Sequence, residues 1–163
     1  MSDTKKDANV RDEEFQFVIF GLSGEEFGVD ISQVREIIRM QDITPVPKAP
    51  EFIEGVVNIR GQIIVVMDLA KRFGLKSEDR SDKARIVVAE VKGNIVGLIV
   101  DEVPEVLRIS KNRIDPAPHM LETQIHSEFI KGLGKLENRI IILLDVDKIL
   151  SQEEAKQVGE AVK

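Results

Sequence analysis

The sequence predicts an all-β fold built as two small antiparallel barrels in tandem, with short helices at strand ends. Three observations favour this fold: the chain repeats itself, each half opens with a hairpin pattern, and each half contains a short unbroken apolar run. The repeat predicts a first barrel at residues 15–82 and a second at 83–150. A flexible polar tail over 1–14 and a helical tail over 151–163 are expected to flank them.

The repeat consists of two blocks that recur in the same order. Residues 52–73 align without a gap with residues 129–150 at an offset of 77, and seven of the twenty-two positions are identical. Upstream, residues 24–39 align with residues 93–108 at an offset of 69, with five identities. Average composition gives about one chance identity in fifteen positions, so this excess indicates a duplication. The longer second offset places extra residues in the second half, within Pro116–Ser127.

Each half begins with a hairpin pattern. Phe15–Leu22 is rich in aromatic and branched residues and is followed by Ser23 and Gly24, which favour a tight turn. Ala84–Val91 and the turn residues Lys92–Asn94 repeat the pattern in the second half.

The apolar runs Ile63–Met67 and Ile140–Leu144 show no alternation and end at Asp68 and Asp145. Short runs of this kind suit strands buried on both faces. Burial of each such side chain contributes roughly 1.5–3 kcal/mol, so two cores are expected there. The two aspartates are positioned to cap a following helical turn, and Gly74 is predicted to end the first one.

Three further segments carry simpler expectations. Residues 76–83 are the most polar internal stretch and predict the loop that joins the barrels. Residues 151–163 favour a helix but contain few apolar residues, so the end of this helix is expected to fray. Gly55, inside a predicted strand, indicates a bulge or a close backbone approach.

No motif predicts catalysis, a cofactor or a metal. The chain has no cysteine, which excludes disulfides and thiolate metal sites. His119 and His126 have no third ligand or serine and carboxylate partners nearby. The Gly132–Lys135 segment lacks the first glycine and the Ser/Thr of a phosphate loop, and is interpreted as a turn between strands. We therefore expect no enzyme activity.

Composition narrows the classes of partner and the location. The net charge of −6 and the absence of Trp and Tyr disfavour nucleic acid, which needs a basic face and stacking aromatics. The polar first fourteen residues and the shortness of the apolar runs predict neither a signal peptide nor a membrane span, so a cytoplasmic location is expected. An OB-type or SH3-like barrel that binds nucleic acid remains the alternative from another class, and a hydrolase or transferase is a third.

Four segments follow a known family pattern in order and spacing: Glu25–Ile37, Ile43–Leu69, Val96–Ile109 and Phe129–Leu150. The Asn58–Gly61 element NIRG, after Phe-Ile-x-Gly, is the most diagnostic match. In these segments the sequence resembles the CheW family of chemotaxis coupling proteins. The resemblance implies a single domain over 15–150 made of two five-stranded SH3-like barrels, and a non-catalytic adaptor that is monomeric in isolation. The implied partners are the regulatory domain of the histidine kinase CheA and the cytoplasmic tip of a methyl-accepting chemoreceptor, which would bring the chain to the membrane-associated receptor array.

The resemblance also implies a receptor-binding groove between the barrels. Its residues here are Val34, Glu36, Gly55, Arg60, Gly97, Val103 and Val106. Such a slot with apolar anchors and a charged rim suits an amphipathic helix. From the residues alone, Val34 and Val103 are repeat mates and belong on equivalent surfaces, although a core position is the alternative. Strand alternation directs Arg60 outward, with a solvated charge as its alternative.

The kinase-binding surface has no motif. Ile43, Pro45 and Val46 are predicted as one contact, because the family contacts are apolar and lie at strand ends of the first barrel. The extra segment of the second half supplies Met120, Leu121 and Ile125 as a predicted second contact.

Overall fold

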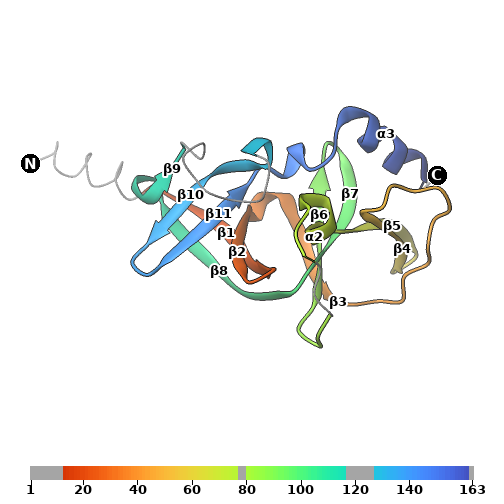
Figure 1. Cartoon of the computed structure of the whole chain (residues 1–163), viewed down its shortest axis with the longest axis horizontal. Coiled ribbons are helices and arrows are strands. Elements are labelled where there is room, and N and C mark those ends of the chain that lie inside the picture. Colours follow the sequence, from red (N-terminus) through yellow and green to blue (C-terminus); the bar gives the residue numbers. More distant parts are fainter. Residues whose placement is uncertain (1–12, 77–79, 117–126, 162–163) are drawn as a thin grey trace, which may run out of the picture.

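The structure is a computed structural model that describes residues 13–76, 80–116 and 127–161 of the chain. It is predominantly β and contains two sheets, which confirms the predicted fold class. The first sheet has the strand order β3 (Val34–Arg39), β6 (Arg85–Val91), β7 (Asn94–Val100), β5 (Gln62–Asp68) and β4 (Ile53–Ile59). The second sheet has the order β8 (Glu102–Ser110), β1 (Glu14–Leu22), β2 (Glu25–Asp30), β11 (Arg139–Leu144), β10 (Ile130–Leu136) and β9 (Ile114–Asp115). Figure 1 shows the two sheets as two lobes along the long axis of the molecule.

The two lobes exchange hairpins. The β6–β7 hairpin from the second half of the sequence lies between β3 and β5 of the first half, and the β1–β2 hairpin lies between β8 and β11. Each exchange creates one parallel pair, β5 with β7 and β11 with β2, among otherwise antiparallel neighbours. The predicted boundary after residue 82 therefore does not separate the two sheets. The predicted tail over 1–14 lies outside the described residues up to residue 12.

The repeat explains why the two lobes look alike. In both sheets an edge strand (β3 or β8) is followed by the exchanged hairpin (β6–β7 or β1–β2). The apolar strand (β5 or β11) and a bulged strand (β4 or β10) come next. The bulges occur at equivalent glycines: the register of β4 shifts between Ile53 and Gly55, and that of β10 shifts between Ile130 and Gly132. This confirms the bulge predicted at Gly55. The Gly132–Lys135 segment, in contrast, is part of strand β10 and is not a turn.

The last four residues of each apolar run are buried, on both faces of the strand as predicted, whereas the first residues, Ile63 and Ile140, are exposed. In β5, Ile64 and Val66 pack into a small core inside the first sheet, whereas Val65 and Met67 face a larger cluster. In β11, the side chains alternate in the same way between the small core of the second sheet and that larger cluster. The larger cluster contains residues of both sheets, so the molecule has a shared core between the lobes in addition to the two predicted ones.

Short helices follow the apolar strands. Helix α2 (Leu69–Phe73) lies in the middle of the molecule (Figure 1). The Asp68 side chain accepts a hydrogen bond from the Lys71 backbone N–H at its start, and Gly74 ends it at φ 72°. The equivalent turn is the 3-10 helix η5 (Val146–Lys148), where the Asp145 side chain makes no cap hydrogen bond, contrary to expectation. The described residues also form the 3-10 turns η1 (Ile31–Gln33), η2 (Lys111–Arg113) and η4 (Ser127–Phe129).

Helix α3 (Gln152–Ala161) confirms the helix predicted in the C-terminal tail. It does not project into solvent, because Ala155 and Val158 are buried in the shared core. The Asn94 amide of β7 donates a hydrogen bond to the Ala155 carbonyl at 3.2 Å, so the helix lies against the first sheet (Figure 1). Within the part of the chain that the structure describes, no helix is long and apolar enough to cross a membrane.

Candidate protein-binding surface

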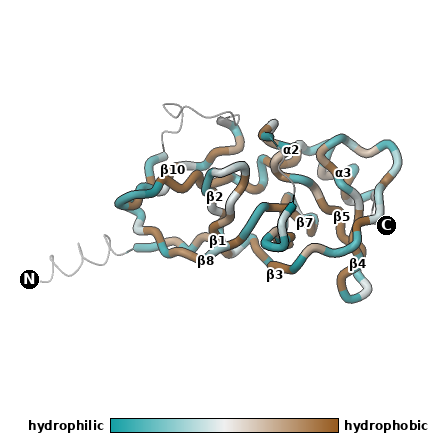
Figure 2. Tube along the Cα trace, turned by 60° about the horizontal axis from the view of Figure 1, so that its bottom comes forward, coloured by the Kyte–Doolittle hydropathy of each residue, from teal (hydrophilic) through white to brown (hydrophobic). Residues whose placement is uncertain are grey.

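The predicted receptor-binding residues lie largely on two equivalent edge strands. β3 and β8 stand at the outer end of the strand order in their respective sheets, and their side chains alternate between half-buried and exposed. The strands follow one another along the same side of the molecule in two views (Figures 1 and 2). In Figure 2 both alternate hydrophilic and hydrophobic residues. This edge pair, β3 and β8, is the candidate surface.

Val34 and Val103 lie at equivalent positions near the start of the two edge strands. Both are half-buried, and both pack against the shared core between the lobes. The structure thus places the two valines at the seam, neither fully buried nor fully exposed.

Arg60 and Glu36 form an ion pair on the first sheet. Arg60 lies in the β4–β5 turn at φ 50°, and the Asn58 side-chain oxygen holds this turn by accepting a hydrogen bond from the Gly61 N–H at 2.8 Å. The Arg60 side chain is 73% exposed. Exposed ion pairs contribute at most about 1 kcal/mol, so the guanidinium remains accessible to a partner at little cost to the fold.

Two exposed aliphatic side chains continue this surface. Val106 on β8 is 46% exposed, as its predicted role requires. Ile37 on β3 is 38% exposed and was not among the predicted residues. The signal was present in the sequence, because Ile37 and Val106 are mates at the repeat offset of 69.

The second sheet carries its own charged group, which the sequence did not predict. Arg139 of β11 donates hydrogen bonds to Glu26 of β2 at 3.0 Å and to Glu105 of β8 at 2.9 Å. The hydrogen bond to Glu26, followed by that to Glu105, raises the pKa of Arg139 above its usual range despite partial desolvation. Glu105 is the repeat mate of Glu36, so both edge strands hold a glutamate at the same position. Arg60 pairs with Glu36 and Arg139 pairs with Glu105, and these two arginines are not repeat mates.

Gly55 and Gly97, two of the predicted receptor-binding residues, are both buried, and their surroundings leave no room for a side chain. Gly55 has φ 149°, and a Cβ there would lie 2.2 Å from the Thr44 carbonyl oxygen. At Gly97 a Cβ would meet Val66 Cγ1 at 2.6 Å and Ile86 Cγ2 at 2.7 Å.

Of the residues predicted to bind the kinase, the structure describes Ile43, Pro45 and Val46, which differ in their exposure. Ile43 is half-buried against the small core of the first sheet. Pro45 is exposed, and Val46 is half-buried at the mouth of a pocket described below. Met120, Leu121 and Ile125, like His119 and His126, lie outside the described residues.

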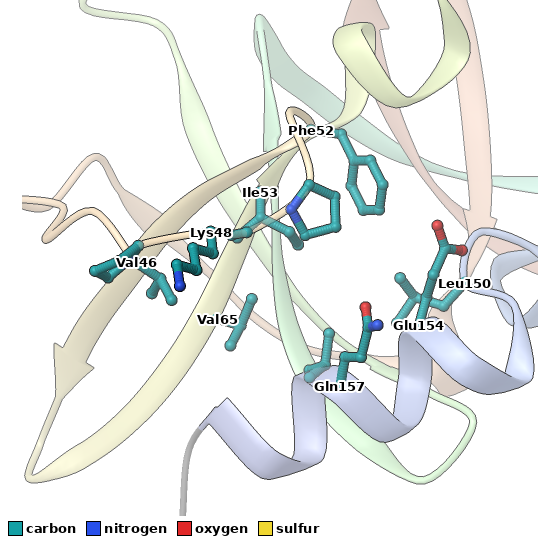
Figure 3. Close-up of a pocket in the computed structure, with 12 residues that line it drawn as sticks. Val46, Lys48, Phe52, Ile53, Val65, Leu150, Glu154 and Gln157 are labelled. Atoms are coloured by element: carbon teal, nitrogen blue, oxygen red, sulfur yellow. The ribbon is translucent and has the colours of Figure 1, made fainter.

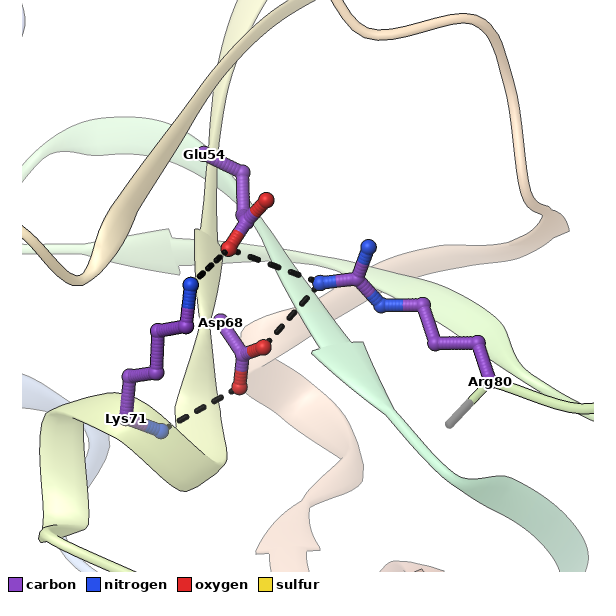
Figure 4. Close-up of polar contacts among 4 residues, drawn as sticks. All are labelled: Glu54, Asp68, Lys71 and Arg80. Atoms are coloured by element: carbon purple, nitrogen blue, oxygen red, sulfur yellow. Dashed lines mark hydrogen bonds and ion pairs between the residues drawn. The ribbon is translucent and has the colours of Figure 1, made fainter. Parts of the chain in front are cut away.

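A network of charged side chains joins β4, the start of α2 and the connection that follows α2. Arg80 pairs with the buried Asp68 at 3.0 Å and with Glu54 at 3.5 Å, and Glu54 accepts a hydrogen bond from the Lys71 ammonium at 2.9 Å (Figure 4). That hydrogen bond is the main cause of a raised pKa of Lys71. Through Arg80 the network anchors the connection between α2 and β6. Over 13–76, 80–116 and 127–161, no three His, Asp or Glu side chains are grouped as a metal site would require.

Comparison with known proteins identifies the same family as the sequence motifs. Residues 16–154 match the family described as CheW-like domain. The chemotaxis protein CheW of Thermotoga maritima is 39% identical over 147 residues, which cover 88% of this chain and 93% of the relative. The chemotaxis protein CheW of Klebsiella aerogenes is 36% identical over 148 residues, which cover 91% and 89%. The solved scaffolding protein TtCheW of Thermoanaerobacter tengcongensis superposes with a TM-score of 0.78 at 40% identity, covering 85% of this chain and 89% of that one.

Proposed function

The chain belongs to the CheW-like domain family, with its fold of two SH3-like barrels, and from that premise we propose that it is a non-catalytic adaptor of bacterial chemotaxis. In this role it couples the cytoplasmic tip of methyl-accepting chemoreceptors to the regulatory domain of the histidine kinase CheA. The relatives are chemotaxis proteins and the solved neighbour is a scaffolding protein, which supports an adaptor and does not favour the nucleic-acid alternative.

The receptor contact is proposed at the edge pair. The observation that carries this proposal is the exposed Arg60 guanidinium of the β4–β5 turn, which pairs with Glu36 of β3. The exposed Ile37 lies next to Glu36 on β3, on the opposite face of the strand. Val106 continues the apolar row on β8, and the half-buried Val34 and Val103 lie at the seam. An amphipathic helix has matching features, with aliphatic side chains for the apolar row and a carboxylate for Arg60.

The kinase contact is proposed on a different face, so that both partners bind at once. Pro45 and Val46 lie on the connection between β3 and β4 and leave apolar surface open there. Two separate non-covalent contacts are what coupling requires, because one shared site would make the partners compete.

Arg60→Glu and Val106→Asp are each expected to weaken receptor binding while leaving the fold intact. Both side chains are largely exposed, so their replacement costs little stability. The first change places two carboxylates side by side at Glu36, and the second puts a charge into an apolar contact. We expect a loss of affinity of roughly tenfold or more in co-sedimentation with receptor cytoplasmic fragments.

Arg113→Glu is the matched control, because Arg113 is exposed on η2 and outside the edge pair. CheA binding by the same variants provides a second control, since the kinase contact is proposed elsewhere. Unchanged receptor affinity in both folded variants would remove the edge pair from the proposal.

A further inference from the structure

A pocket of about 510 Å³ lies between residues 46–50 and helix α3, away from the edge pair. Its half-buried apolar lining includes Val46, Phe52 and Ile53, and Figure 3 shows these side chains on the loop side, opposite helix α3. The volume falls within the range of roughly 300–1,000 Å³ that small-molecule sites occupy. The kinase contact proposed above reaches this pocket only at Val46, and the adaptor role makes no use of its interior.

The loop wall of the pocket is held in place. Pro45, Pro47 and Pro50 restrict the backbone of this segment, because proline fixes φ. Hydrogen bonds close both ends of the loop: Thr44 and Val56 exchange two backbone bonds of 2.9 and 2.8 Å, and the Ile53 N–H donates to the Pro50 carbonyl at 3.0 Å. The wall is therefore already formed without a ligand.

The helical wall is held equally well. The Ser151 N–H donates to Glu154 Oε1 at 2.8 Å, and the Glu154 N–H donates to Ser151 Oγ at 3.1 Å, which is a reciprocal capping box. Glu154 also pairs with Arg72 at 2.9 Å, and Asn94 of β7 binds the Ala155 carbonyl. A pocket between two fixed walls loses little conformational entropy when a ligand enters.

The polar groups of the pocket favour an anion. The one carboxylate in the lining, Glu154, is already neutralised by Arg72. Lys48 is exposed at φ 61° and has no ion pair within the described ranges. The Gln157 amide points from α3 toward the loop (Figure 3) and supplies a hydrogen-bond donor. An apolar space with an unpaired ammonium at its rim matches a molecule with an apolar body and one negative group.

We propose that this pocket binds a small amphiphilic anion, with its hydrocarbon part on Val46, Phe52 and Ile53 and its carboxylate near Lys48 and Gln157. Such a ligand would join α3 to the loop before β4. It would therefore stabilise the folded chain by binding the native state alone.

The probe is decanoate, added at concentrations below micelle formation to the full ¹⁵N-labelled chain. The backbone amide signals of residues 46–53 and of α3 should shift in a saturable manner, and the midpoint of thermal unfolding should rise. Decanol should bind more weakly, and decyltrimethylammonium, of opposite charge, should bind least.

Two pairs of variants test the site. Lys48→Asn keeps a residue that tolerates positive φ and should weaken decanoate binding roughly tenfold without affecting decanol. Lys92→Asn, at an exposed lysine with φ 49° in the β6–β7 turn, should leave decanoate binding unchanged. Gln157→Phe should fill the pocket and abolish the shifts, whereas Lys156→Phe on the same helix, outside the lining, should not.

Equal binding of the anion and the cation would overturn the proposed ligand class, and unchanged binding by Gln157→Phe would overturn the site. If decanoate fails to bind while Gln157→Phe weakens co-sedimentation with CheA, the pocket accepts a partner side chain and the small-ligand proposal is wrong. Receptor co-sedimentation does not depend on this pocket, so the adaptor function is tested separately.

Discussion

A Gly55→Ala variant is expected to lose its cooperative fold. The added Cβ would lie 2.2 Å from the Thr44 carbonyl oxygen and 2.7 Å from its carbon, and both are backbone atoms that cannot rotate away. Relief would require the Thr44–Val56 pairing to open, which removes two backbone hydrogen bonds. Together with a φ of 149°, this clash should cost more than about 4 kcal/mol of unfolding free energy, a large part of the 5–15 kcal/mol typical of a domain.

Gly61→Ala is the matched control for this variant. Gly61 also has positive φ, at 86°, but a Cβ added there would have nothing within 4 Å, so only the backbone cost of about 1 kcal/mol applies. Urea unfolding followed by circular dichroism compares the two. A Gly55→Ala chain as stable as Gly61→Ala would show that the close approach at Thr44 is not a constraint. If the prediction holds, Gly55 variants that lose receptor binding do so by unfolding rather than by losing a contact.

An Arg72→Ala variant is expected to lower the unfolding free energy by about 3 kcal/mol. Arg72 of α2 is only 20% exposed and joins the two lobes. Its Nε donates to the Ile149 carbonyl at 2.7 Å, its Nη2 pairs with Glu154 at 2.9 Å, and its guanidinium lies 4.6 Å from the centre of the Phe52 ring. Each charge-assisted bond is worth roughly 1.5–3 kcal/mol, and the cation–π contact adds about 1 kcal/mol. Because Arg72 and Glu154 are both partly exposed, solvent screening reduces the sum to about 3 kcal/mol.

Two substitutions separate the sources of this effect. Arg72→Lys keeps the charge but not the planar fork, so it should recover only part of the loss. Arg35→Ala removes an exposed pair with Glu90 at 3.6 Å and should change stability by less than about 0.5 kcal/mol. A fall of the same small size for Arg72→Ala in chemical denaturation would contradict the role of Arg72 in joining the lobes.

The repeat predicted more of the fold than any single motif. It identified the equivalent strands, the two-sided burial of β5 and β11, and the bulge at Gly55, because these depend on local patterns that recur in both halves. It could not identify the exchange of hairpins. The chain passes from one sheet to the other at Asp30–Gln33 and again at Asp101, and no local pattern in the sequence marks these two crossings.

Those residues of the candidate surface that belong to the repeat or to the family motif could be predicted from the sequence. Arg60, Glu36 and Val106 lie exposed or half-buried on or beside the edge strands, and Ile37 could have been found as the mate of Val106. Arg139 could not be predicted from the sequence. Its repeat mate is Gln62, and its two glutamate partners come from strands that are distant in sequence. Arg72 was missed for a related reason: its partners Phe129, Ile149 and Glu154 all belong to the other half.

The hairpin exchange also constrains how the chain folds as it is synthesised. The β1–β2 hairpin leaves the ribosome first, yet its sheet partners β8 and β11 end only at residues 110 and 144. The first sheet must likewise wait for β7, which ends at residue 100. During elongation both edges of the first hairpin stay without their native neighbours, which makes this aromatic-rich segment the part of the nascent chain most in need of protection from aggregation.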